Sequence, residues 1–179
     1  MTNEDDTLVR QALGGDRKAF TMLVLKYEKP IYNLAYRMTQ NAEDAADITQ
    51  NTFVKAYLRL DSFNPAHKFF SWLYRIAVNE SLNQIERRRR AQTFRYDPPQ
   101  SGPSPDEELQ HKESCAHLAR ALAAMTLEQR VVIILKHLLL LPYREIAEIL
   151  DISEKTVKSR LFTARHILRD QLVKQGYPK

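Results

Sequence analysis

Residues 141–172 read LPYREIAEILDISEKTVKSRLFTARHILRDQL and combine two apolar stripes with a short interruption between them. Both stripes have the spacing of one helical face, and the small Ala147 stands where two helices would nearly touch. Ser153 ends the interruption and is a preferred N-cap residue. The segment therefore predicts a helix-turn-helix, with helices over residues 142–150 and 154–174. The apolar positions are Ile146, Ala147 and Leu150 in the first helix and Val157, Leu161, Ala164, Leu168 and Leu172 in the second.

The opposite face of the second helix is polar and basic, apart from one phenylalanine. In a helix-turn-helix this face enters the major groove, where Lys donates to guanine and Phe contacts a thymine methyl. A hairpin that only contacts protein is the alternative, but it explains an exposed Phe162 among cations less well. The pattern favours duplex DNA as the partner. The candidate DNA-binding residues are Lys155, Lys158, Ser159, Phe162, His166 and Arg169.

A proline-rich segment divides the chain. Residues 96–106 read YDPPQSGPSPD, and the prolines in this segment forbid a regular helix. Good helix formers dominate on both sides of it. We therefore predict an all-α fold of two helical domains, residues 1–93 and 107–179, joined by an extended, flexible linker at residues 94–106.

Capping residues predict where the helices of the first domain begin. Asp16 should cap a second helix, Pro30 should open a third through its fixed φ, and Asn41 should cap a helix that ends near residue 60. The other helices are expected over residues 7–13, 69–90, 107–125 and 127–140.

Residues 69–90 read FFSWLYRIAVNESLNQIERRRR and predict a helix with two unlike faces. One half is apolar and suits the core, whereas the other carries an indole, two amides and guanidinium groups along one line. Arginines bind phosphate, amides hydrogen-bond base edges and aromatics stack on an unpaired base, so the line fits nucleic acid. Alternatively, Trp72 covers the core and the arginines form a solvated helix end. The line consists of Trp72, Asn79, Asn83 and Arg90, with Arg75, Glu86 and Arg87 beside it.

The helix expected from residue 42 to about residue 60 has apolar residues on its outer side. Val54 and Leu58 should be exposed among Asp44, Asp47, Asn51 and Lys55, which is typical of a protein interface. The alternative is two scattered surface apolars. The buried side is expected to hold Ala45, Ile48, Thr49, Thr52, Phe53, Ala56, Tyr57 and Leu60.

Composition narrows the class of protein. The net charge of +5 favours a polyanion partner, and the single cysteine suits a reducing compartment. The N-terminus lacks a signal-peptide pattern and no apolar run has membrane-spanning length, so we expect a cytoplasmic protein without direct membrane insertion. No constellation of catalytic residues or cofactor-binding motif appears, which predicts no enzyme activity and no cofactor. His111, Cys115 and His117 lie close together but are too few for a tetrahedral metal site.

The order of these motifs resembles an extracytoplasmic-function (ECF) sigma factor, a promoter-recognition subunit of bacterial RNA polymerase in the sigma-70 family. WLYRIA followed by two asparagines and EIAEIL followed by TVKSRL, across a short linker, carry the resemblance. It implies a region 2-like first domain, which binds polymerase and opens the minus-10 element, and a region 4-like second domain, which reads the minus-35 element. The implied partners are the β′ clamp helices and β flap of the core, promoter DNA and an anti-sigma factor.

The resemblance also assigns residues to two further surfaces. The implied minus-10 set is Phe63, Phe69, Trp72, Arg75, Asn79, Asn83, Arg87 and Arg90. The implied polymerase-binding set is Asp44, Asp47, Gln50, Asn51, Val54, Lys55 and Leu58. The alternative functions are a conventional helix-turn-helix regulator with an N-terminal sensing or dimerisation domain, and an adaptor that binds only protein.

Several positions depart from the family pattern. Thr163 stands where an arginine is frequent, Asn51 replaces a common glutamate, and Pro142 and Asp151 replace a common cap and a common turn glycine. The apolar residues 138–140 are either core or a surface for a partner.

Overall fold

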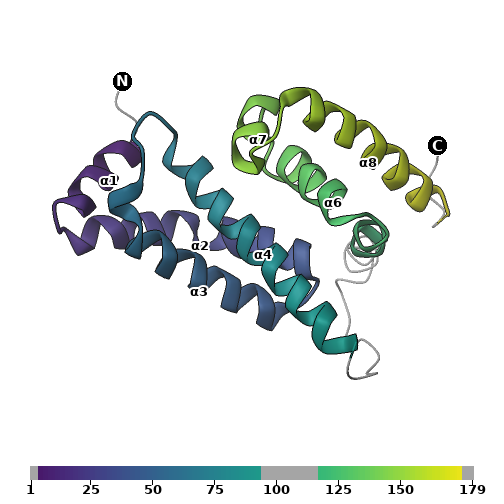
Figure 1. The fold of residues 1–179 in the computed structure, drawn as a ribbon, viewed down its shortest axis with the longest axis horizontal. Helices are drawn as coiled ribbons and strands as arrows, with labels where there is room; N and C mark the ends of the chain where they lie inside the picture. Colours follow the sequence, from purple (N-terminus) through teal and green to yellow (C-terminus); the bar gives the residue numbers. More distant parts are fainter. Residues whose placement is uncertain (1–3, 94–116, 175–179) are drawn as a thin grey trace, which may run out of the picture.

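The computed structural model describes residues 4–93 and 117–174, and within these ranges it contains helices and no β-strand. Figure 1 shows two groups of helices side by side, in agreement with the predicted all-α fold of two helical domains. The first group contains α1 (Glu4–Leu13), α2 (Arg17–Thr39), α3 (Ala42–Leu58), the 3-10 turn η1 (Leu60–Ser62) and α4 (Phe69–Thr93). The second contains a helical segment at residues 117–123, α6 (Leu127–Ile133), the π-helix η2 (Ile134–Leu138), α7 (Tyr143–Leu150) and α8 (Glu154–Lys174). The expected linker at residues 94–106 lies outside the described residues.

Two of the predicted helix starts in the first group are confirmed. The Asp16 side chain accepts hydrogen bonds from the backbone N–H groups of Lys18 and Ala19, at 2.9 and 3.4 Å. The Asn41 side chain accepts one from the backbone N–H of Asp44 at 2.8 Å. Each cap satisfies donors that a helix N-terminus leaves unpaired, which fixes where the chain turns.

The prediction that Pro30 opens a new helix is wrong. Pro30 lies inside α2, which continues from Arg17 to Thr39. A proline within a helix removes one backbone hydrogen bond and crowds the preceding turn. Side chains on both sides of it, Leu23 and Ile31, are completely buried in the same core, so packing outweighs the local penalty.

The helix-turn-helix forms as predicted, with α8 beginning at Glu154 and a backbone N–H of Thr156 donating to Ser153 Oγ at 3.1 Å. Ile146, Val157 and Leu161 are fully buried between its helices. Asp151 adopts the left-handed conformation (φ 54°), which aspartate tolerates better than most residues.

The helix expected over residues 127–140 is shorter than predicted. The α-helix ends at Ile133 and continues as the π-helix Ile134–Leu138. Leu140 follows with φ 55°, an unusual conformation for a bulky residue, and its side chain is 78% exposed. Leu138 is also exposed, so these two are surface residues and not core.

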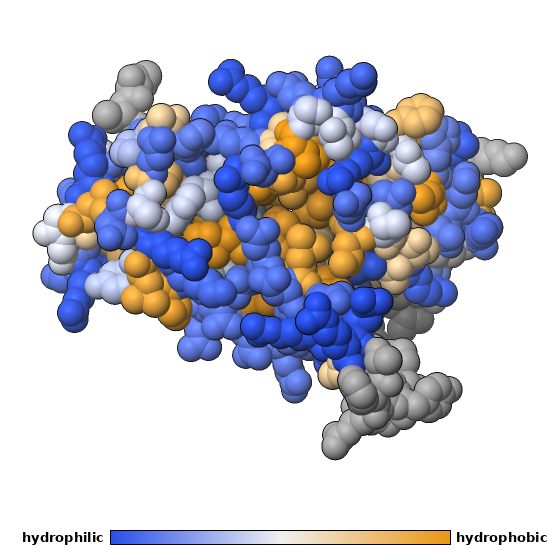
Figure 2. All heavy atoms as spheres, in the orientation of Figure 1, coloured by the Kyte–Doolittle hydropathy of each residue, from blue (hydrophilic) through white to orange (hydrophobic). Residues whose placement is uncertain are grey.

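The two groups of helices share one packed interior. A single cluster of buried apolar side chains extends from Val9 in α1 to Ala164 in α8. Arg130 Nη1, at the start of the second group, donates to the backbone oxygen of Met38 in α2 at 2.7 Å. Figure 2 shows apolar side chains gathered between the two hydrophilic halves of the molecule. The packing therefore sets how α7 and α8 lie relative to α4.

Candidate nucleic-acid and polymerase interfaces

The predicted line of polar side chains lies along one side of α4. Trp72 and Arg75 are half-buried at the beginning of the helix, and Asn79 and Asn83 are exposed one and two turns further on. The opposite side supplies Leu73 and Ala77 to the core, both fully buried. The helical period therefore separates a core side from a polar side, which is available to a ligand beyond Arg75.

Two members of the implied minus-10 set are not on this surface. Phe63 and Phe69 are only 6% and 1% exposed, so the expectation that these rings lie on the exposed surface is wrong, although Phe63 lines the cavity beside Trp72. Both rings lie against Trp72, with centroid separations of 5.5 and 5.8 Å. Both rings are buried in the core because removing a large aromatic surface from water is favourable. They fix the position of the indole.

A cavity of about 120 Å³ opens beside Trp72. Ser71 lines this cavity, and its Oγ is buried with no hydrogen-bond partner among the described residues. A buried hydroxyl without a partner is costly, and a ligand that hydrogen-bonds to it would remove that cost. The lining residues are Ser62, Phe63, Asn64, His67, Ser71, Trp72, Arg75 and Glu148.

The resemblance implied that the loop from Phe63 to Phe69 surrounds the extruded base, which includes Asn64 and His67, but sequence reasoning missed Ser71 as a candidate site residue. The available signal was the position of Ser71 directly before Trp72, at the start of the polar line. Its spacing put it on no recognisable face, because the cavity is formed jointly by α4, the preceding loop and α7. The sequence placed the pocket at Asn79 and Asn83, whereas neither residue lines this cavity.

The arginine-rich end of α4 is partly paired within the chain. Glu86 accepts from Arg89 at 3.0 Å and from Arg90 at 3.1 Å. These hydrogen bonds, that of Arg89 first, lower the pKa of the Glu86 carboxyl. Arg88 lies 2.7 Å from the Asp44 carboxylate of α3. Arg87 and Arg90 are exposed, so this end remains a cationic surface.

The predicted DNA-reading face of α8 is exposed along its whole length. All six candidate residues, Lys155, Lys158, Ser159, Phe162, His166 and Arg169, are exposed. The Phe162 ring is 67% exposed and contacts the His166 ring edge-on, at a centroid separation of 4.6 Å. Thr163 donates from Oγ1 to the backbone oxygen of Ser159 at 3.3 Å, and so offers no cation where the family often has one.

The outer side of α3 is an apolar surface with polar neighbours, as predicted. Val54 is 49% exposed and Leu58 is 71% exposed, while Asp47, Gln50 and Asn51 are also exposed. Large exposed apolar side chains on one face are typical of a protein-binding site. Lys55 belongs to this helix but pairs with Glu80 of α4 at 2.5 Å.

Two expectations on α3 are wrong. Asp44 was expected on the outer surface, but it is 7% exposed and accepts from Gln84 Nε2 at 2.8 Å in addition to its pairing with Arg88. It connects α3 to α4 because a buried carboxylate needs partners. Tyr57 was expected in the core, but it is 48% exposed and its ring contacts Phe20 edge-on at 5.0 Å.

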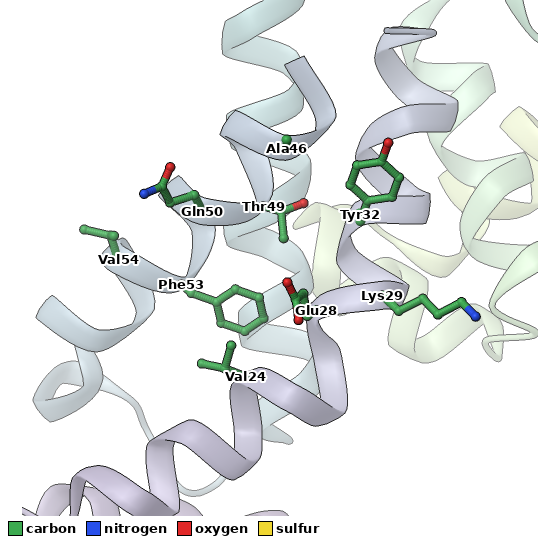
Figure 3. Close-up of a pocket in the computed structure, with 9 residues that line it drawn as sticks. All are labelled: Val24, Glu28, Lys29, Tyr32, Ala46, Thr49, Gln50, Phe53 and Val54. Atoms are coloured by element: carbon green, nitrogen blue, oxygen red, sulfur yellow. The ribbon is translucent and has the colours of Figure 1, made fainter. Parts of the chain in front are cut away.

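A groove of about 680 Å³ lies between α2 and α3. Figure 3 shows Val24 of α2 and Phe53 of α3 pointing toward each other, and Tyr32 of α2 and Val54 of α3 also line the groove. Met22 and Leu25 on α2 are also exposed, at 55% and 65%. The sequence indicated the α3 side of this groove and missed the α2 side, where the prediction had divided α2 at Pro30.

Other kinds of site find little support in residues 4–93 and 117–174. No cluster of three or more metal-ligating side chains occurs there, while His111 and Cys115 lie outside these ranges. No helix in the same ranges has the length and apolar character needed to cross a membrane.

Comparison with known proteins decides the family. Residues 23–91 match the sigma-70 region 2 model and residues 116–168 match the sigma-70 region 4 model. The chain is 34% identical over 176 residues to the ECF RNA polymerase sigma factor SigW of Bacillus subtilis, covering 92% of this chain and 94% of SigW. The chain belongs to the ECF sigma factors of the sigma-70 family.

Other relatives agree. The sigma factor is 33% identical over 180 residues to the ECF sigma-E factor of Escherichia coli, covering 94% of both chains. Its fold matches CnrH in complex with the cytosolic domain of CnrY, with a TM-score of 0.77, 27% identity and coverage of 98% of this chain and 100% of that chain. It also matches the sigma factor RpoE in complex with the anti-sigma factor NepR from Bartonella quintana, with a TM-score of 0.73, 26% identity and coverage of 87% and 97%. A sigma factor directs RNA polymerase and catalyses no reaction itself.

Proposed function

We propose that this sigma factor selects promoters through two DNA-binding surfaces, the cavity and polar side of α4 for the minus-10 element and the exposed face of α8 for the minus-35 element. RNA polymerase core docks on α3 and the adjoining groove. The observation that carries the proposal is the cavity at Trp72, where a buried hydroxyl has no partner among the described residues and lies near an indole and a guanidinium group. An unpaired base supplies hydrogen-bonding edges and a stacking face to such a site.

The energetics of strand opening support a role for α4. Extruding a base from a duplex costs a few kcal/mol, and stacking on an aromatic side chain returns about 1–3 kcal/mol. A hydrogen bond to Ser71 adds to this, and Arg75 and Arg87 offer charge to the flanking phosphates. Asn79 and Asn83 continue the same side of the helix, where bases downstream of the extruded one would lie.

The polymerase assignment rests on α3. Its exposed Val54 and Leu58 have no core to join, and the groove beside them accepts an apolar side chain from a partner helix. We assign this surface to the clamp helices of β′, and assign the exposed Leu138 and Leu140 of the second domain to the β flap. We also propose an anti-sigma factor as regulator and a cytoplasmic location, since relatives of this chain form such complexes and act on RNA polymerase.

Run-off transcription with purified core polymerase tests the function, and permanganate footprinting tests the role of α4. Asn79→Ala with Asn83→Ala should reduce opening at the minus-10 element about tenfold or more, since each lost hydrogen bond costs about 1 kcal/mol. Loading onto core should be unchanged.

Asn33→Ala, an exposed amide on α2, is the control and should open promoters normally. Normal melting by the double variant would show that the polar side of α4 does not contact the opened strand.

A further inference from the structure

The acidic side of α7 lies on the basic groups that surround the α4 cavity. Glu145 Oε1 is 2.5 Å from Lys68 Nζ, and Glu148 Oε1 is 2.7 Å from His67 Nδ1. Arg75 donates from Nη2 to the backbone oxygen of Glu148. Three cationic or potentially cationic side chains of the first domain are therefore occupied by acceptors from the second.

The same contact closes the cavity. Seven of its eight lining residues come from η1, the loop before α4 and α4 itself, and the eighth is Glu148 of α7. A carboxylate thus stands at the site where a nucleotide would bring its phosphate. Because like charges repel and Arg75 is already engaged, a DNA strand must displace α7 before it can enter.

The duplex-reading face of the second domain is not involved. Lys158, Ser159 and Phe162 on α8 are exposed while α7 contacts α4. The contact therefore restricts the minus-10 surface specifically, and it separates the two DNA-binding functions of one chain.

The ion pairs between α7 and the α4 cavity are individually weak. The side chains of Lys68 and His67 are 59% and 56% exposed, so solvent screens their ion pairs with α7 and each contributes little on its own. The shared apolar interior and the hydrogen bond from Arg130 to Met38 add to the closing energy, so opening requires a partner that binds the open form better.

We propose that α7 is an internal competitor of DNA: in the free sigma factor its acidic side occupies the minus-10 cavity, and opening of the two domains exposes it. The inference rests on the proposed function of the cavity. It adds that the chain is self-inhibited for strand capture before any other protein binds.

The experiment uses the full chain with Glu145→Gln and Glu148→Gln combined. The probe is a labelled single-stranded oligonucleotide carrying the nontemplate minus-10 sequence of a promoter that this chain transcribes with core. If the open fraction rises from about one tenth to about one half, the apparent affinity of the free chain rises about fivefold. Small-angle scattering should show a larger radius of gyration, and the emission of Trp72, the single tryptophan, should shift.

A matched control separates this effect from nonspecific charge. Glu128→Gln with Glu154→Gln changes the net charge equally, and Glu128 pairs with Arg160 inside the second domain. This variant should remain compact. In addition, Glu145→Lys should open the chain, and adding Lys68→Glu should restore compactness by reversing the ion pair.

The outcomes distinguish the two levels of the proposal. If the Glu145→Gln, Glu148→Gln chain binds the oligonucleotide no better than the control variant while wild type transcribes with core, the inference is overturned and the function stands. If no form of the chain supports transcription with core, the function itself fails.

Discussion

At the scale of single residues, the hydroxyl of Ser71 is expected to matter for DNA binding and not for stability. Its Oγ is buried without a partner in residues 4–93 and 117–174, whereas Ser81 on the same helix donates from Oγ to the backbone oxygen of Ala77 at 2.8 Å. Ser71→Ala removes no existing hydrogen bond, so the free energy of unfolding should stay within about 0.5 kcal/mol of wild type. Capture of the minus-10 strand by the sigma factor bound to core should weaken about fivefold, the cost of one hydrogen bond.

Thermal unfolding and oligonucleotide binding to the core-bound sigma factor measure these two effects. Ser81→Ala is the control, and it should lower stability with little effect on DNA affinity. Unchanged DNA binding by Ser71→Ala would show that the Ser71 hydroxyl does not contact the DNA strand.

Some residue roles were predictable and others were not. The exposure of Asn79, Asn83 and Phe162 follows from helical period alone, because each lies opposite an apolar stripe. The burial of Phe63 and Phe69 does not, since it depends on a loop folding back over the first turn of α4. The cavity could not be predicted at all, because one of its walls comes from a helix more than 70 residues away.

At the scale of elements, we expect the two sides of α3 to have separable roles, one in stability and one in binding core. Asp44 connects it to α4, and Leu58 faces solvent. Asp44→Asn should lower the free energy of unfolding by about 1–3 kcal/mol, because it weakens the ion pair with Arg88 and leaves a buried amide with an unsuitable partner. Leu58→Ser should leave stability unchanged and weaken binding to core about tenfold.

Denaturant unfolding and a core-polymerase pull-down measure the two effects. The variants act as controls for each other, since each should affect only one measurement. Loss of core binding by Asp44→Asn at a temperature where it is folded, together with normal binding by Leu58→Ser, would reverse the assignment of the two sides.

Element boundaries were predicted well where a cap fixed them and poorly where packing decided. Asp16, Asn41 and Ser153 each accept the backbone hydrogen bonds that their residue types predicted. Pro30 shows the limit of local rules, because the apolar residues on both sides of it keep α2 continuous. The π-helix at residues 134–138 left no signal that hydrophobic spacing could distinguish from an α-helix.

At the scale of the molecule, Arg130 of α6 links the two domains because its side chain hydrogen-bonds a backbone carbonyl group at the end of α2. Its Nη1 donates to the backbone oxygen of Met38, in the last turn of α2, where carbonyl groups lack helical partners. Its Nε donates to the Leu122 oxygen at 2.9 Å within its own domain. The cation also lies at the negative end of the α2 dipole. Burial lowers the pKa of the guanidinium group, which nevertheless stays charged at neutral pH.

Arg130→Met keeps the apolar stem and removes these donors. We expect the free energy of unfolding to fall by about 1–3 kcal/mol, since buried carbonyl groups lose their partner. Because one of those carbonyls belongs to α2, the two domains should unfold less cooperatively, and calorimetry should show a broader or divided transition. Arg160→Met, which removes an ion pair within the second domain, should preserve the single transition. If Arg130→Met also unfolds in one sharp transition at the wild-type temperature, the coupling of the domains resides in their shared apolar core and not in this guanidinium group.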